Sequence, residues 1–207
     1  MEKKKIYVFD FDGTLTTADT LLEFIRFAAG RRRMLWGFAL HAPWLVLMKL
    51  GLYPNYKAKQ RVFAHFFGGM EAGRFRALCE QFARQGRHLL RPAALRFVDK
   101  VRPGADGMAI VSASIDDWVE PFARLYMGRQ RDGAPIAVLG TKVEVGADGR
   151  LTGRFATANC YGPEKVRRIA AVWPRRDDCF ITAFGDSRGD KEMLSYADEG
   201  YYKPFRF

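Results

Sequence analysis

The sequence predicts an α/β protein with a Rossmann-like core, built on a parallel sheet with a helical insertion after its first strand. Three short apolar runs, at residues 6–9, 108–111 and 180–184, have the length and composition of buried strands. Helical patterns follow each run, and strands that alternate with helices form parallel sheets with right-handed crossovers. Nearly a hundred residues with little strand signal separate the first run from the second.

Polar side chains follow all three predicted strands. Asp10 and Asp12 come directly after the first strand. Ser112 follows the second strand, and Asp186 follows the third. Ligand sites of open parallel sheets lie beyond the carboxyl ends of the strands, so we expect these side chains to gather in one site.

The long stretch after the first strand predicts a cap of about four helices. Thr20-x-x-Glu23 matches a capping box that opens the first helix, and Gly30 closes that helix. Pro43 is expected to break the apolar stretch that comes next. The predicted cap helices and apolar stretches cover residues 21–29, 34–50, 55–67 and 71–90.

The chain therefore divides into two predicted domains. The core domain takes residues 1–16 and 89–207, and the helical cap domain takes residues 17–88. Pro92 begins the helix that returns to the core. A hairpin is predicted around residues 146–149, because Gly-Ala-Asp-Gly separates two short β-prone runs.

Charge is concentrated in the cap. The 207-residue chain has a net charge of +11, and residues 17–90 hold 12 Lys and Arg against 4 Asp and Glu. Such a field favours an anionic partner such as phosphate, an acidic lipid surface or nucleic acid, although a solvated basic face explains it equally well. Nucleic acid is not expected, because the aromatic residues lie in apolar runs and do not alternate with Lys and Arg.

Three dispersed cysteines and a charged start without a secretory signal indicate a reducing, cytoplasmic location. The sequence leaves the oligomeric state open.

The pair Asp10 and Asp12 is the first candidate for chemistry. Two carboxylates this close repel each other unless a cation shares them, and Mg²⁺ takes about six oxygen ligands of this kind. One carboxylate can attack phosphorus while the other acts as acid and then as base. Gly13 permits the tight turn that this requires. An Asx turn or a helix cap is the alternative reading of the same residues.

Four motifs in order resemble those of the haloacid dehalogenase-like (HAD) superfamily. The segment Asp-Phe-Asp-Gly-Thr-Leu-Thr, which begins at Asp10, is similar to the first motif. Ser112 resembles the phosphate-binding hydroxyl of the second motif, and Lys165 resembles the lysine of the third. Asp186 and Asp190 resemble the acidic pair of the fourth. The alternatives are a turn residue for Ser112, a solvated lysine, and a helix cap for Asp190.

The resemblance implies a HAD-type phosphatase with an aspartyl-phosphate intermediate. It makes Asp10 the nucleophile and Asp12 the acid and base. Ser112, Lys165 and Gly13 would bind the phosphate. Mg²⁺ would be held by Asp10, Asp12 and Asp186. Asp190 would orient Lys165 or metal-bound water.

The position of the cap resembles that of subfamily IB, a branch with C1-type caps that includes phosphoserine phosphatase. In that branch the cap chooses the leaving group, which makes Asp19, Arg31, Arg32 and Arg33 the candidates for substrate contact. The apolar stretch 34–50 reaches about 25 Å as a helix, short of the ~30 Å of a bilayer core. Two tryptophans beside the arginines are typical of a membrane interface, whereas packing inside the cap is the alternative.

Further segments look similar to the phosphatidylglycerophosphatase C family. They are the basic and apolar cap, residues 159–165 and residues 199–204. This likeness implies an anionic lipid phosphate as substrate and peripheral contact with the inner face of an anionic membrane. A phosphoserine phosphatase-like enzyme for a small metabolite is the second reading. A membrane-surface binding module whose HAD site has lapsed is a third.

Overall fold

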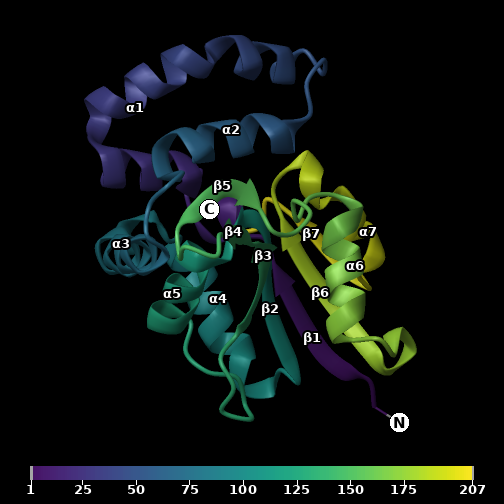
Figure 1. The fold of residues 1–207 in the computed structure, drawn as a ribbon. Coiled ribbons are helices and arrows are strands. Elements are labelled where there is room, and N and C mark those ends of the chain that lie inside the picture. Colours follow the sequence, from purple (N-terminus) through teal and green to yellow (C-terminus); the bar gives the residue numbers. More distant parts are fainter. Residues whose placement is uncertain (1, 207) are drawn as a thin grey trace.

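A five-stranded parallel sheet with helices on both faces forms the centre of the computed structural model, which describes residues 2–206 (Figure 1). The strand order is β3-β2-β1-β6-β7. All neighbouring strands pair in parallel, which confirms the predicted sheet. The strands are β1 (Lys4–Phe9), β2 (Gly107–Ile115), β3 (Ala137–Thr141), β6 (Cys179–Gly185) and β7 (Glu199–Tyr202).

Successive side chains of β1 point to opposite faces of the sheet and pack into two separate hydrophobic cores. Ile6 and Val8 face the helices α6 and α7, whereas Phe9 belongs to the larger cluster beneath α4 and α5. Both faces of this central strand are covered, so it reads as a nearly continuous apolar run. The covering helices are α4 (Pro92–Val101), α5 (Asp116–Tyr126), α6 (Pro163–Val172) and α7 (Lys191–Tyr196).

Of the helices between β1 and β2, the three that precede α4 lie toward the carboxyl ends of the strands (Figure 1). The predicted hairpin is confirmed as β4 (Val143–Val145) and β5 (Leu151–Phe155), which pair in antiparallel fashion beneath α2. Gln60 of α2 accepts a hydrogen bond from the backbone N–H of Phe155 at 3.0 Å, which fastens the hairpin to that helix. The three helices are α1 (Thr20–Lys49), α2 (Asn55–Phe67) and α3 (Ala72–Gln85).

Helix α1 differs from the prediction at two points. Its N-cap is Asp19, which accepts from the N–H groups of Leu21 and Leu22, so the predicted capping box at Thr20 is wrong. The helix also runs through Pro43 to Lys49 without the predicted break.

Packing against α2 on both sides of the proline explains this continuity. Phe38 packs against Phe66 before it, and Trp44 lies under Arg61 after it, with the guanidinium 4.2 Å from the ring centroid.

Gly30 interrupts α1, as predicted. Its φ of 79° is a conformation that favours glycine, and the chain changes direction there. The part of α1 beyond Gly30, residues 31–49, is called the arm below. In Figure 1 the arm lies outermost, across α2 from the sheet.

Candidate active site

The carboxyl ends of β1, β2 and β6 meet around one cavity of about 700 Å³. Asp10 follows β1, and its N–H donates to the carbonyl of Phe184 on β6 at 2.8 Å. Sheet pairing places Ser112 beside it on β2. The predicted gathering of polar side chains is confirmed for the residues that line this cavity: Asp10, Asp12, Asp19, Ser112, Lys165 and Asp186.

Lys165 is the cationic centre of the site. It lies on the first turn of α6, and its Nζ is 2.7 Å from Asp10 Oδ1 and 2.5 Å from Asp190 Oδ1. Burial lowers the pKa of the Lys165 ammonium, but the charges of Asp10 and Asp190 outweigh burial and hold the pKa above its usual value. The ammonium therefore stays charged and fixes one oxygen of Asp10.

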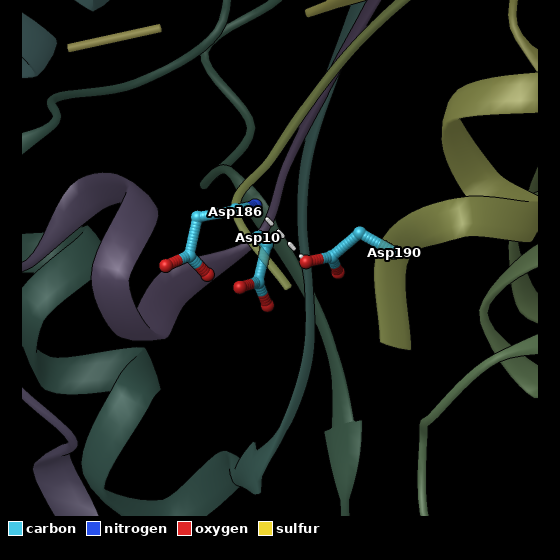
Figure 2. Close-up of side chains that lie close together, drawn as sticks. All are labelled: Asp10, Asp186 and Asp190. Atoms are coloured by element: carbon cyan, nitrogen blue, oxygen red, sulfur yellow. Dashed lines mark hydrogen bonds between the residues drawn. The ribbon is translucent and has the colours of Figure 1, made fainter. Parts of the chain in front are cut away.

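Three carboxylates converge beside this lysine (Figure 2). One oxygen from each of Asp10, Asp186 and Asp190 lies within 4.8 Å of the others. Burial is the main cause that raises the pKa of Asp10 and of Asp186, and a neighbouring carboxylate adds to it in both. A hard cation with oxygen ligands would relieve this crowding.

Asp190 is already saturated by protein donors. Its Oδ2 accepts from the N–H groups of Asp186 and Ser187 and from the Ser187 hydroxyl, at 2.8–3.1 Å. Its Oδ1 accepts from Lys165. This pattern suits a residue that orients Lys165, as predicted. Asp186 has one such donor, because Arg206 Nη2 donates to its Oδ2 at 2.8 Å, and Asp10 has Lys165 on Oδ1. Each of these two carboxylates keeps its second oxygen for a metal ion.

Gly13 brings the chain close to Asp186. Its φ is 74°, and an added Cβ would lie 2.2 Å from Asp186 Oδ2. Its N–H donates to Thr16 Oγ1 at 3.2 Å, and the predicted contact of Gly13 with a phosphate stays a prediction. The geometry gives Gly13 the part of making room for Asp186.

Asp12 is not one of these three carboxylates, and its predicted part in holding Mg²⁺ stays a prediction. Its Oδ1 accepts from the N–H of Thr20 at 2.8 Å and from the Thr20 hydroxyl at 2.6 Å. Its Oδ2 accepts from Ser114 Oγ at 2.5 Å. These donors hold the carboxylate toward α1 and β2, away from Asp186, although Asp12 still lines the cavity.

The sequence as a whole matches the haloacid dehalogenase-like hydrolase family over residues 7–195. The chain belongs to the haloacid dehalogenase-like hydrolase family. The predicted superfamily and the prediction of a hydrolytic enzyme are thereby confirmed.

Two relatives match nearly the whole of this HAD hydrolase. Protein CicA of Caulobacter vibrioides is 35% identical over 206 residues, which cover 97% of this chain and 86% of that protein. A protein of unknown function from Bordetella pertussis superposes with a TM-score of 0.73 at 21% identity, covering 93% of this chain and 86% of the other.

Two further solved structures share the fold. A HAD family hydrolase from Salmonella enterica has a TM-score of 0.71 at 19% identity, covering 97% of this chain but 62% of that protein. A substrate-bound phosphoserine phosphatase has a TM-score of 0.63 at 18% identity, covering 98% and 86%. The HAD hydrolase thus has the α/β fold of these proteins.

Sequence reasoning missed Lys59 of the HAD hydrolase. This lysine lies on α2 next to the buried Ala58, lines the cavity, and donates to the carbonyl of Ala113 at 2.6 Å. Burial lowers the pKa of Lys59, and the carboxylates of Asp12 and Asp19 oppose that shift. The signal in the sequence that could have identified Lys59 is its position on the apolar face of α2.

Sequence reasoning also missed Thr20 and Ser114, which donate to the Asp12 carboxylate, and Trp118, which donates to Thr20. Thr20 was assigned to a capping box, Ser114 lies two residues past the motif residue Ser112, and Trp118 lies in a segment without a motif.

The predicted cap residues fall into two groups. Asp19 lines the cavity and caps α1. Arg31, Arg32 and Arg33 are exposed at the start of the arm and do not line the cavity, so the prediction that they contact the substrate there is wrong. The change of direction at Gly30 carries them outward, which no local pattern could indicate.

Proposed function

We propose that this HAD hydrolase is a Mg²⁺-dependent phosphomonoesterase that forms an aspartyl-phosphate on Asp10. The observation that carries the proposal is the pairing of a buried Asp10 with Lys165 at 2.7 Å on the floor of an open cavity. Phosphoryl transfer needs a placed nucleophile and positive charge around the equatorial oxygens, and this floor supplies both.

The chain's own residues account for both half-reactions. A carboxylate oxygen of Asp10 forms a bond to phosphorus as the bond to the leaving oxygen breaks, and Asp12 gives that oxygen a proton. Asp12 then takes a proton from water, which attacks phosphorus and releases Asp10. Lys165 and Ser112 bind the equatorial oxygens.

Magnesium fits this arrangement because Asp10 and Asp186 are oxygen donors in a crowded carboxylate group. When bound, Mg²⁺ would neutralise charge on the phosphoryl group, as it does in phosphoryl transfer generally.

We propose further that the substrate is an anionic lipid phosphate such as phosphatidylglycerophosphate. The cavity wall opposite the carboxylates is apolar, and the cations Lys49 and Lys59 also line it. Acyl chains would cover the apolar wall and the lysines would pair with a second phosphate, whereas a small zwitterion such as phosphoserine would leave that wall in water. The apolar wall consists of Leu21, Leu22, Phe38, Ala42, Leu45, Val46, Met48 and Val62.

The helices over residues 17–88 would act as the cap, and the arm would touch an anionic membrane surface. Trp36 is 79% exposed, and Leu35 and Leu40 are also exposed, on the same part of α1 as the basic residues 31–33. No helix among residues 2–206 combines the length and the apolar character that crossing a membrane requires. We therefore propose peripheral contact.

The test is a phosphate-release screen on phosphatidylglycerophosphate in anionic vesicles, phosphoserine and a chromogenic ester, with Mg²⁺ or with EDTA. We expect hydrolysis that needs Mg²⁺ and prefers the lipid, and we expect Asp10→Asn to abolish it. Residual activity of more than a few per cent in Asp10→Asn would refute the nucleophile. Equal rates on phosphoserine and lipid would refute the lipid substrate in favour of a metabolite phosphatase. Sedimentation with vesicles but no hydrolysis would indicate a binding module.

A matched pair of variants isolates the apolar wall. Val46 lines the cavity and is 55% exposed, whereas Val172 on α6 is 43% exposed and does not line it. Val46→Asp should lower kcat/KM for the lipid and leave the chromogenic ester unaffected, and Val172→Asp should change neither.

A further inference from the structure

Thr20 joins the cap to the carboxylate that the proposed function uses as acid and base. It is the first residue of α1 and is fully buried. Its N–H and its hydroxyl both donate to the same oxygen, Asp12 Oδ1, at 2.8 and 2.6 Å. Since Asp19 caps α1, the Thr20 side chain is not needed as a cap.

A buried indole fixes the direction of the Thr20 hydroxyl. Trp118 Nε1 donates to Thr20 Oγ1 at 3.1 Å. An indole N–H can only donate, so the single hydrogen of the hydroxyl is left to point elsewhere. The Asp12 oxygen at 2.6 Å is nearer than Ser114 Oγ at 3.4 Å and accepts that hydrogen.

The second oxygen of Asp12 is held from the sheet. Ser114, near the end of β2, donates to Asp12 Oδ2 at 2.5 Å. One oxygen is therefore tied to the cap helix and the other to the core, which sets the plane of the carboxylate. By contrast, the carboxylate of Asp10 is held by Lys165, and neither Thr20 nor Ser114 bonds to it.

We propose that Thr20 is a positioning residue that ties the Asp12 carboxylate to cap helix α1, with Trp118 as its buried anchor. The inference rests on the proposed phosphatase activity. Residues of α1 also line the cavity, so Thr20 links the helix that would contact the substrate to the group that protonates its leaving oxygen. A carboxylate misplaced by about 1 Å loses much of its acid catalysis.

Leaving-group dependence separates positioning from general damage to the fold. An alkyl phosphate needs protonation of its leaving oxygen, whereas nitrophenolate leaves without it. The parameter kcat/KM reports the steps through phosphorylation of Asp10, in which Asp12 would act as acid. Loss of folded protein lowers kcat/KM for both esters by the same factor.

The experiment compares kcat/KM on a nitrophenyl and an alkyl phosphate in wild type, Thr20→Val and Thr20→Ser. Thr20→Val, which keeps the shape and removes the hydroxyl, should lower the alkyl/nitrophenyl ratio at least about tenfold. Thr20→Ser should bring the ratio back to within about threefold of wild type, because the hydroxyl returns.

Trp118→Phe removes the N–H together with the five-membered ring and keeps a benzene ring that can still stack on Phe24. The ratio should fall in the same direction by a smaller factor, whereas the cavity left in the core affects both esters alike. If Thr20→Val does not fold, Trp118→Phe takes its place in the experiment.

Three results would overturn the proposal. An equal loss on both esters would make Thr20 merely structural. An unchanged ratio in Thr20→Val, or in Trp118→Phe where Thr20→Val does not fold, would show that the hydroxyl does not position Asp12. A Thr20→Ser enzyme as impaired as Thr20→Val would exclude the hydroxyl as the cause. A wild-type enzyme inactive on both esters with Mg²⁺ would instead refute the proposed function, and this inference with it.

Discussion

Gly13→Ala is expected to weaken magnesium binding through a single added methyl group. The new Cβ would lie 2.2 Å from Asp186 Oδ2 and 2.6 Å from its Cγ. An ordinary contact begins at 3.4 Å, so the Asp186 carboxylate would have to retreat by more than an ångström. A displacement of that size in a catalytic group costs about 100-fold in rate.

Backbone strain adds a second effect, which a control must remove. Gly13 has a φ of 74°, where alanine costs about 1–2 kcal/mol. Gly149, in the turn of the hairpin, has the same φ of 74° and no atom within 4 Å of an added Cβ. Gly149→Ala therefore carries the strain without the clash.

The assay measures Mg²⁺ binding by calorimetry and the Mg²⁺ concentration that gives half-maximal phosphate release. We expect both variants to lose similar stability in thermal unfolding with EDTA. Only Gly13→Ala should need more Mg²⁺, by roughly one to two orders of magnitude, because it disturbs the placement of a metal ligand. If Gly13→Ala and Gly149→Ala bound Mg²⁺ alike, Asp186 would not be a metal ligand at the position that the structure gives it.

Three other predictions follow from burial and exposure. Lys165→Met leaves two buried carboxylates without their cation and should lower the free energy of unfolding by about 3 kcal/mol in urea titrations with EDTA, whereas the exposed Lys100→Met should not. Burial raises the pKa of Asp116 to about 7, so the folded chain binds this proton more tightly than the unfolded chain and loses stability as pH rises from about 4 to 7. Between pH 4 and 7, the stability of Asp116→Asn relative to wild type should therefore increase by on the order of 4 kcal/mol. If the difference in free energy of unfolding between the two proteins did not change with pH, the assigned burial would be contradicted. Trp36→Ala should lower partitioning onto anionic vesicles roughly tenfold in co-sedimentation, and no change would exclude the arm as the contact.

The strands that the sequence predicted are those buried on both faces. β1, β2 and β6 give continuous apolar runs because helices cover both sides of them. β7 was missed because it is an edge strand whose four residues are all exposed. β3, at the other edge, was missed although residues 136–139 form an apolar run, and three of its five residues are only partly buried.

Sequence reasoning predicted which residues gather where they directly follow buried strands, and it missed partners whose contacts depend on residues elsewhere in the chain. Asp10 and Asp186 sit at strand ends that pair directly, so their meeting follows from topology. Asp19 and Thr20 are both good N-cap residues, and only the distant Asp12 and Trp118 decide which of them caps. No local pattern contains that information.

The backbone torsion at Gly30 sets the direction of the arm, and the arm forms part of the cavity wall. The apolar wall is carried partly by the arm beyond this glycine, while the reacting carboxylates lie on the sheet side. No atom lies within 4 Å of a Cβ added there, so a substitution at Gly30 acts through torsion alone. The width of the entrance can therefore be retuned at one position, by evolution or by design, while the chemistry at its floor stays as it is.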